Sequence, residues 1–208
     1  MARRPENGHA HFVRAYVLRY AGLLDEAVGE CNTALTLDPS NRLFRSCAIA
    51  SYLTGAYERA FDFISLESET EWAQDNSMSI LLRQGKRREA LKLLRQGQIN
   101  VPYRDYLARC LEGGSVAELS PLAQQIEDVV MPVRDGEQHY WTASNLTMCG
   151  HSDAALRLLR QAVRRGYCSY PAMDKDPLFA ALRDEPRFAE IRDAAIACQQ
   201  RLLEHRAR

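Results

Sequence analysis

The sequence predicts an all-α protein, and its composition, the spacing of its apolar residues and a repeated motif all favour this fold class. Ala and Leu contribute 27 and 25 of the 208 residues, whereas Gly and Pro together contribute only 19. Ala and Leu rank high in helix propensity, and Gly and Pro are the main helix breakers. Apolar residues recur at spacings of three and four, as on the buried face of a helix. We therefore expect helices throughout the chain.

The repeated motif is a Gly followed five positions later by an Ala. It occurs at Gly22/Ala27, Gly55/Ala60, Gly85/Ala90 and Gly150/Ala155. A Gly ends a helix well because it readily adopts the left-handed conformation at the turn. Small residues on both sides of the turn let the two helices approach closely. Each occurrence therefore predicts a helix–turn–helix unit.

The predicted elements follow in order along the chain. The hairpins pair 12–21 with 24–37, 43–54 with 57–66, 72–84 with 87–96, and 138–149 with 152–165. The long gap between Gly85 and Gly150 requires one irregular unit, of which Gly114 and Leu119 are the expected remnant. Pro121 is expected to start a shifted helix there, because proline is favoured in a first helical turn. Pro177 and Pro186 in the same way predict two tail helices, near 178–183 and 187–204.

The first unit resembles the tetratricopeptide repeat (TPR) family. It carries, at the family spacings, Ala15, Gly22, Ala27, Ala34 and Pro39. The resemblance implies a right-handed α-solenoid of TPR-like hairpins over residues 1–166, closed by a short helical capping tail over 167–208. The units are expected near 8–40, 41–69, 70–98, 99–131 (degenerate) and 136–166. The tail resembles those that close TPR arrays in bacterial multidomain regulators.

The same resemblance implies a site, because the first helix of each TPR unit lines a concave groove that commonly binds peptides or partner helices. By position, the groove residues are Phe12, Tyr16, Arg19, Tyr20, Arg42, Arg45, Tyr52, Trp72, Asn76, Tyr140 and Trp141, and the third unit also offers Asp75 and Ser79. Aromatic residues and Arg are enriched in binding hot spots. In the alternative interpretation, Tyr16, Tyr20 and Tyr52 pack within or between hairpins, or cover a missing repeat. The clamp for chaperone tails is not reproduced, so that partner class is not expected.

Three classes of function follow from these patterns. The first is a non-catalytic scaffold that binds a protein or peptide in the groove. The second is the C-terminal regulatory or sensor module of a larger bacterial regulator, such as a Ser/Thr kinase, a nucleotide cyclase or a winged-helix transcription factor. The third is an enzyme with an unrecognised site in the region 101–131. We expect no enzyme activity, because the sequence contains no nucleophile elbow, phosphate loop or dinucleotide fingerprint.

The composition excludes several classes of ligand and predicts a cellular compartment. The five His and six Cys show no metal-ligand spacing, so neither a metal nor a cofactor is expected. Lys and Arg balance Asp and Glu at 27 each, and therefore no nucleic-acid partner is expected. No apolar run approaches the ~20 residues of a membrane span, so no membrane contact is expected. The cysteines are widely scattered, which predicts buried, unpaired thiols and a cytoplasmic location.

The N-terminus predicts one further property. Pro5-Glu6-Asn7 precedes the similar Pro39-Ser40-Asn41 by 34 residues, one full repeat. It therefore resembles the exit of a preceding unit, and the chain is expected to be part of a longer array. An uncapped first repeat would expose its packing face and favour self-association. In the alternative interpretation, Pro5-Glu6-Asn7 is simply a turn that starts the first helix.

Overall fold

The computed structural model of the protein describes residues 7–96 and 102–206, and all regular structure in these two ranges is helical. The all-α prediction is therefore confirmed. The α-helices are α1 (Gly8–Tyr20), α2 (Leu24–Leu37), α3 (Cys47–Leu53), α4 (Tyr57–Ile64), α5 (Glu71–Arg83), α6 (Arg87–Gln96), α7 (Pro102–Leu111), α8 (Val116–Val130), α9 (Gly136–Met148), α10 (Ser152–Arg164), α11 (Tyr170–Lys175) and α12 (Pro186–Arg206). Short 3₁₀ helices are η1 (Arg42–Ser46), η2 (Ser65–Glu67) and η3 (Pro177–Leu182).

The repeat motif marks four helical hairpins, as the sequence predicts. The turn glycines Gly22, Gly55, Gly85 and Gly150 have φ values between 73° and 87°. The Ala five residues after each of them is fully buried where the two helices of the hairpin meet. Consecutive helices α1 and α2, α3 and α4, α5 and α6, and α9 and α10 pack against each other. The local mechanism is therefore the expected one: a left-handed Gly turns the chain and a small residue permits close packing.

The degenerate region also forms a hairpin, but its second helix starts earlier than expected. Helix α8 begins at Val116 and contains Pro121, so the prediction that Pro121 starts this helix is wrong. The Ser115 side chain accepts from the Glu118 N–H, and the Glu118 carboxylate accepts from the Ser115 N–H. This capping box gives hydrogen-bond partners to two backbone N–H groups at the N-terminus of α8 and thereby sets where the helix starts. Residue 101, the expected boundary of this region, lies outside the described residues.

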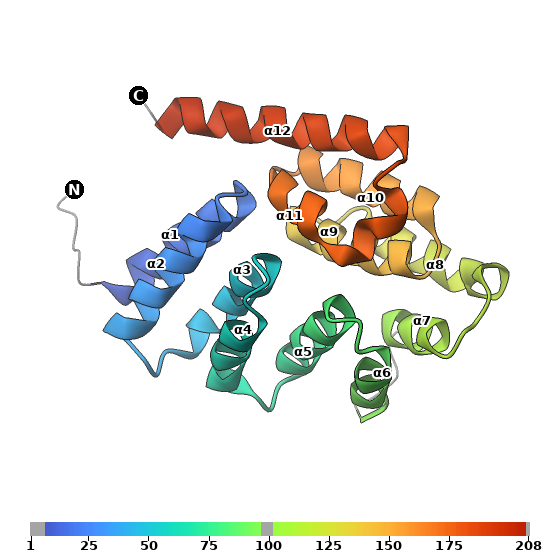
Figure 1. Ribbon diagram of the computed structural model, residues 1–208, viewed down its shortest axis with the longest axis horizontal. Helices are drawn as coiled ribbons and strands as arrows, with labels where there is room; N and C mark the ends of the chain where they lie inside the picture. Colours follow the sequence, from blue (N-terminus) through green and yellow to red (C-terminus); the bar gives the residue numbers. More distant parts are fainter. Residues whose placement is uncertain (1–6, 97–101, 207–208) are drawn as a thin grey trace.

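The first hairpin and the C-terminal part of the chain meet. Figure 1 shows the helices following an arc from α1 to α7, with α12 lying across α10 toward the first hairpin. Gln199 of α12 donates to the Ala21 carbonyl at 2.7 Å, and the Cys168 N–H donates to the Tyr20 carbonyl at 2.8 Å. Arg206, at the end of α12, forms an ion pair with Glu26 of α2. These contacts close the chain on itself.

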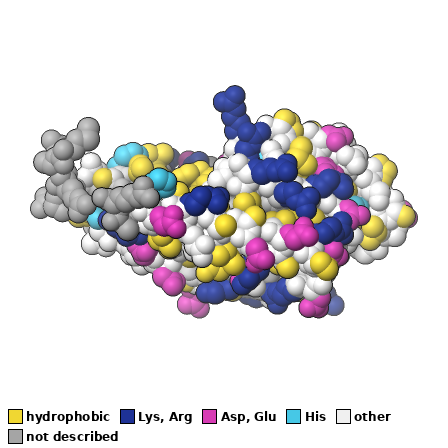
Figure 2. All heavy atoms as spheres, turned by 90° about the horizontal axis from the view of Figure 1, so that it is seen from above, with side chains coloured by type: hydrophobic (Ala, Val, Ile, Leu, Met, Phe, Trp, Pro, Cys, Tyr) yellow, Lys and Arg dark blue, Asp and Glu magenta, His cyan; other side chains and the backbone are white. Residues whose placement is uncertain are grey.

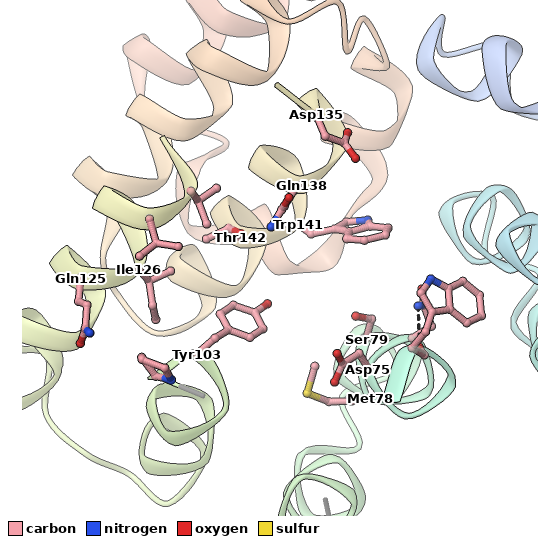
Figure 3. Close-up of a pocket in the computed structure, with 15 residues that line it drawn as sticks. Asp75, Met78, Ser79, Tyr103, Gln125, Ile126, Asp135, Gln138, Trp141 and Thr142 are labelled. Carbon is pink, nitrogen blue, oxygen red and sulfur yellow. Dashed lines mark hydrogen bonds between the residues drawn. The ribbon is translucent and has the colours of Figure 1, made fainter. Parts of the chain in front are cut away.

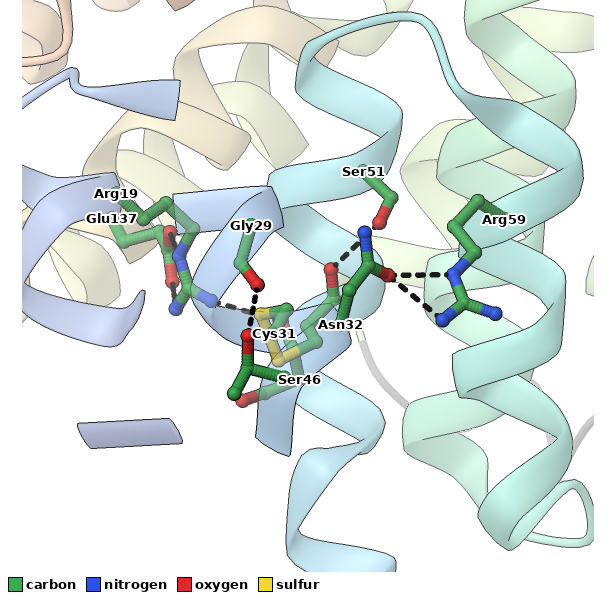
Figure 4. The surroundings of a disulfide bond; sticks show 10 residues. Arg19, Gly29, Cys31, Asn32, Ser46, Ser51, Arg59 and Glu137 are labelled. Carbon is green, nitrogen blue, oxygen red and sulfur yellow. Dashed lines mark hydrogen bonds and ion pairs between the residues drawn. A yellow bond between two sulfur atoms is a disulfide. The ribbon is translucent and has the colours of Figure 1, made fainter. Parts of the chain in front are cut away.

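All six cysteines are paired, so the prediction of unpaired thiols is wrong. Disulfides join Cys31 to Cys47, Cys110 to Cys149, and Cys168 to Cys198. The first links α2 to α3, next to the contact between α1 and α9 (Figure 4). The second links α7 to the end of α9, and the third ties α12 to the turn before α11. The Cα–Cα distances are 5.4 to 5.7 Å, within the range that a disulfide requires.

At the N-terminus, the structure describes only the last residue of the Pro5-Glu6-Asn7 motif. The Asn7 side chain accepts from the N–H groups of His9 and Ala10 and caps α1. Asn is among the preferred residues at a helix N-cap. Pro5 and Glu6 lie outside the described residues, and their predicted role as the exit of a preceding repeat stays a prediction.

Replacing Gly22 by Ala is expected to destabilise the protein more than the same change at Gly85. Both glycines have positive φ, which costs an L-residue about 1–2 kcal/mol. A Cβ at Gly22 would lie 2.9 Å from the Ser169 Cα, whereas a Cβ at Gly85 meets nothing within 4 Å among the described residues. We expect about 1–3 kcal/mol of additional loss at Gly22, because backbone must shift. Urea denaturation of both variants measures the difference, and equal losses would contradict the close contact.

Candidate functional site

Three of the expected groove residues lie in the interior. Arg19, Tyr52 and Tyr140 are each at most 2% exposed. Arg19 binds Glu137 of α9 through two hydrogen bonds of 2.7 and 2.8 Å, and it also donates to the Ser46 carbonyl. Its guanidinium lies 4.6 Å from the centre of the Tyr16 ring. Arg19 therefore holds α1 against α9 and is not open to a partner.

A second buried polar cluster surrounds Asp176, the residue that precedes η3. Its carboxylate accepts from Arg83 of α5 at 2.6 Å and from the Tyr140 hydroxyl at 2.7 Å. The Arg83 guanidinium also lies 5.1 Å from the centre of the Tyr52 ring. Burial raises the pKa of the Tyr52 hydroxyl well above its ordinary value. The C-terminal tail therefore contacts α5 through Asp176, close to Tyr52 of α3.

The remaining expected residues of the first two units lie near the surface. Phe12 is half-buried against Phe44, with ring centres 5.4 Å apart. Tyr16 and Tyr20 stack on each other, and the Tyr20 hydroxyl donates to Asp135. This agrees with the alternative interpretation that these tyrosines pack between hairpins. Two arginines complete the set: Arg42 is exposed, and Arg45 pairs with Glu67 and lies over Trp72.

The other expected residues, from the third and last units, come together at one cavity. Trp72 and Asn76 of α5 and Trp141 of α9 line a space of about 420 Å³ between α5, α7, α8 and α9. Figure 3 shows Trp141 and Tyr103 extending into the gap toward the helix that carries Asp75 and Ser79. Its full lining is Trp72, Asp75, Asn76, Met78, Ser79, Pro102, Tyr103, Gln125, Ile126, Val129, Val130, Asp135, Gln138, Trp141 and Thr142. A mostly apolar cavity of this size with a few polar groups is typical of ligand sites.

The polar groups of the cavity are already ordered by contacts within the chain. Asp75 forms an ion pair with Arg104 at 2.7 Å, and burial raises the pKa of Asp75 although Arg104 acts in the opposite direction. The Tyr103 hydroxyl binds the Asn145 amide, and burial raises the pKa of Tyr103 to about 12. Tyr103 is therefore neutral at physiological pH. Such pre-ordered side chains lower the entropy lost on binding.

The sequence did not point to several lining residues. Asp135 is the N-cap of α9, where its side chain accepts from the Glu137 N–H at 2.9 Å. Tyr103 and Ile126 come from the degenerate hairpin, whose register the repeat pattern does not define. A helix N-cap is recognisable from an Asp before a helical pattern. That signal would have placed Asp135 at the start of α9, but not at a cavity.

The surface over α12 carries charges of both signs. Figure 2 shows Lys and Arg side chains interspersed with Asp and Glu on this face. Arg157 and Arg160 of the basic run in α10 form ion pairs with Glu127 and Glu190. Among the described residues, no helix is long and apolar enough to cross a membrane. The same residues contain no group of three or more potential metal ligands.

Comparisons with known proteins add no family. The chain matches none of the models of known protein families, and no curated protein matches its sequence. The resemblance to tetratricopeptide repeats therefore rests on the residue pattern alone.

Proposed function

We propose that this protein is a non-catalytic scaffold that binds a peptide segment of a partner protein at the cavity between α5, α7, α8 and α9. In this proposal the helical hairpins form a right-handed TPR-like array, and the cavity is the part of its concave face that remains open. The observation that carries the proposal is the convergence of Trp72, Trp141 and Tyr103 on one cavity of about 420 Å³. Tryptophan and tyrosine are the residues most enriched in binding hot spots.

The contacts elsewhere on the expected groove support this choice of site. Arg19, Tyr52 and Tyr140 are buried against the chain's own C-terminal half. A partner would have to displace these contacts to bind there, whereas the cavity is lined by half-buried aromatic side chains that need no such displacement. A space of this size accommodates one or two side chains of a bound segment.

A regulatory module of a larger protein is the second candidate function. The tail over 167–208 favours it, because α12 contacts both the first hairpin and α10. A ligand at the cavity would then act on an effector domain encoded on the same chain.

The redox state of the cysteines bears on the compartment in which either type of protein works. The three disulfides suit an oxidising compartment better than the cytoplasm that the sequence predicts.

The proposed function is tested with a random dodecapeptide library displayed on phage. Peptides selected on the purified protein are synthesised and titrated by calorimetry and by tryptophan fluorescence. The chain contains only two Trp, and both line the cavity, so their emission reports directly on its occupancy. We expect Trp141→Ala to weaken the binding of selected peptides at least tenfold, because it removes an aromatic anchor.

The matched control is Phe61→Ala, which removes an exposed aromatic side chain from α4, away from the cavity. It is expected to change the affinity less than twofold. Circular dichroism and thermal unfolding establish that both variants are folded. Selected peptides that bind Trp141→Ala as tightly as the unmodified protein would contradict the proposed site, as would a selection that yields no binding peptide.

A further inference from the structure

One arrangement recurs in this chain: an arginine lies over an aromatic ring and also pairs with a carboxylate. In the described part of the chain, five arginines each lie with the guanidinium within 6 Å of the centre of an aromatic ring and also form an ion pair with a carboxylate. The combinations are Arg19 with Tyr16 and Glu137, Arg45 with Trp72 and Glu67, Arg59 with Phe63 and Asp62, Arg83 with Tyr52 and Asp176, and Arg192 with Tyr170 and Asp174. An aromatic face and a carboxylate together attract a guanidinium, through the ring quadrupole and through charge.

The cavity contains the same two parts, and two of its three aromatic rings have no arginine over them. Arg45 lies over Trp72, whereas among the described residues neither Trp141 nor Tyr103 has a cation over its face. Among the described residues, the lining contains the two carboxylates Asp75 and Asp135 but no Lys, Arg or His. Asp75 is paired with Arg104. Asp135 accepts hydrogen bonds from the Tyr20 hydroxyl and the Glu137 N–H through Oδ1, but it forms no ion pair with any residue that the structure describes. Asp135 therefore leaves a negative charge at the rim beside apolar aromatic walls.

From these observations we infer that the cavity recognises an arginine residue of the partner peptide. The guanidinium lies against the Trp141 face and pairs with the Asp135 carboxylate. Arginine fits better than lysine, because its planar guanidinium both stacks on a ring and forms directed bonds with a carboxylate. This inference rests on the proposed function, since it names the residue that the proposed site selects.

The test uses the selected peptides and a second set in which each arginine is replaced by citrulline, its neutral isostere. We expect selected peptides to contain arginine, and citrulline to weaken their binding at least tenfold. Asp135→Asn removes the rim charge but keeps the helix cap, because Asn and Asp are equally good N-caps. It is expected to weaken the arginine peptide at least fivefold and to leave the citrulline peptide within twofold. Asp184→Asn, which removes an exposed carboxylate elsewhere, is expected to leave both within twofold.

The outcomes separate the two proposals. Selected peptides without arginine, or citrulline peptides that bind as tightly as arginine peptides, would overturn the inference. So would Asp135→Asn weakening both peptides equally. In each of these cases the proposed function still stands if Trp141→Ala abolishes binding. Binding that does not respond to Trp141→Ala overturns the proposed function and the inference with it.

Discussion

Glu137→Gln is expected to lower the free energy of unfolding by about 3–5 kcal/mol. The substitution keeps the shape of the side chain but removes its charge, and Arg19 then remains buried without a counter-ion. Breaking one partner of a buried ion pair costs this much because the remaining charge is desolvated. Both side chains are at most 4% exposed, so water does not replace the lost partner. Urea denaturation at neutral pH measures the change.

The matched control is Glu26→Gln. Glu26 also pairs with an arginine of a distant segment, Arg206, but both side chains are about half exposed. An exposed pair is worth about 0–1 kcal/mol, so the control is expected to lose no more than this. A double variant in which Arg19 becomes Met and Glu137 becomes Leu should lose less than Glu137→Gln alone, because no charge is left buried. Equal losses in Glu137→Gln and Glu26→Gln would contradict the buried pair.

Removing the disulfide between Cys110 and Cys149 is expected to cost about 4 kcal/mol. This bond closes a loop of 39 residues, and the loss follows from the additional freedom of the unfolded chain. The same reasoning gives about 3 kcal/mol for Cys31–Cys47, which closes 16 residues. Double Cys→Ala variants of each pair, prepared under oxidising conditions, are compared by urea denaturation. The larger loss is expected for the longer loop.

A direct check of the pairing comes first. Alkylation of the denatured, unreduced protein with iodoacetamide should label no cysteine, and peptide mass spectrometry should recover the three cross-linked pairs. Six labelled cysteines in protein purified without reductant would contradict the disulfides. A smaller loss for Cys110 and Cys149 than for Cys31 and Cys47 would contradict the loop-closure explanation while leaving the bonds themselves intact.

The helical hairpins were predictable because their signals are local. A left-handed Gly such as Gly22 and a small contact residue such as Ala27 act within one turn of the chain, so their spacing alone defines a hairpin. The start of α8 was equally local, since Ser115 and Glu118 form the spacing of a capping box. The interpretation of Pro121 as a helix start overlooked that signal. Proline is favoured in the first turn because the N–H that it lacks has no partner there. Inside α8, Pro121 gives up one backbone hydrogen bond, and the capping box sets the helix start before it.

The cysteine pairing and the buried ion pairs could not be predicted in the same way. Arg19 and Glu137 are 118 residues apart, and nothing in either neighbourhood shows that α1 and α9 meet. Cys149, the partner of Cys110, lies beyond α8, whose position the repeat pattern does not define. The ion pair and the disulfide both depend on how successive hairpins are arranged in space. That arrangement is a property of the packed molecule and not of any one segment.

For the candidate site, the sequence located five of the lining residues and missed the rest. These five occupy the inner face of a predicted first helix: Trp72, Asp75, Asn76, Ser79 and Trp141. Tyr103 comes from the degenerate hairpin, and Asp135 comes from a loop before α9, so neither has a position defined by the repeat. The site therefore required the relative placement of four helices.

The contact of the first hairpin with α9 and α12 also limits how this protein can change in length. An open array of helical hairpins accepts a duplicated or deleted unit, because each unit contacts only its neighbours. Here an inserted hairpin would move α9 away from α1 and separate Arg19 from Glu137. The ion pair between Arg19 of α1 and Glu137 of α9 thus fixes the number of units between these two helices, although the intervening units take no part in it. Length variation among descendants of such a chain is expected in its loops and not in its count of hairpins.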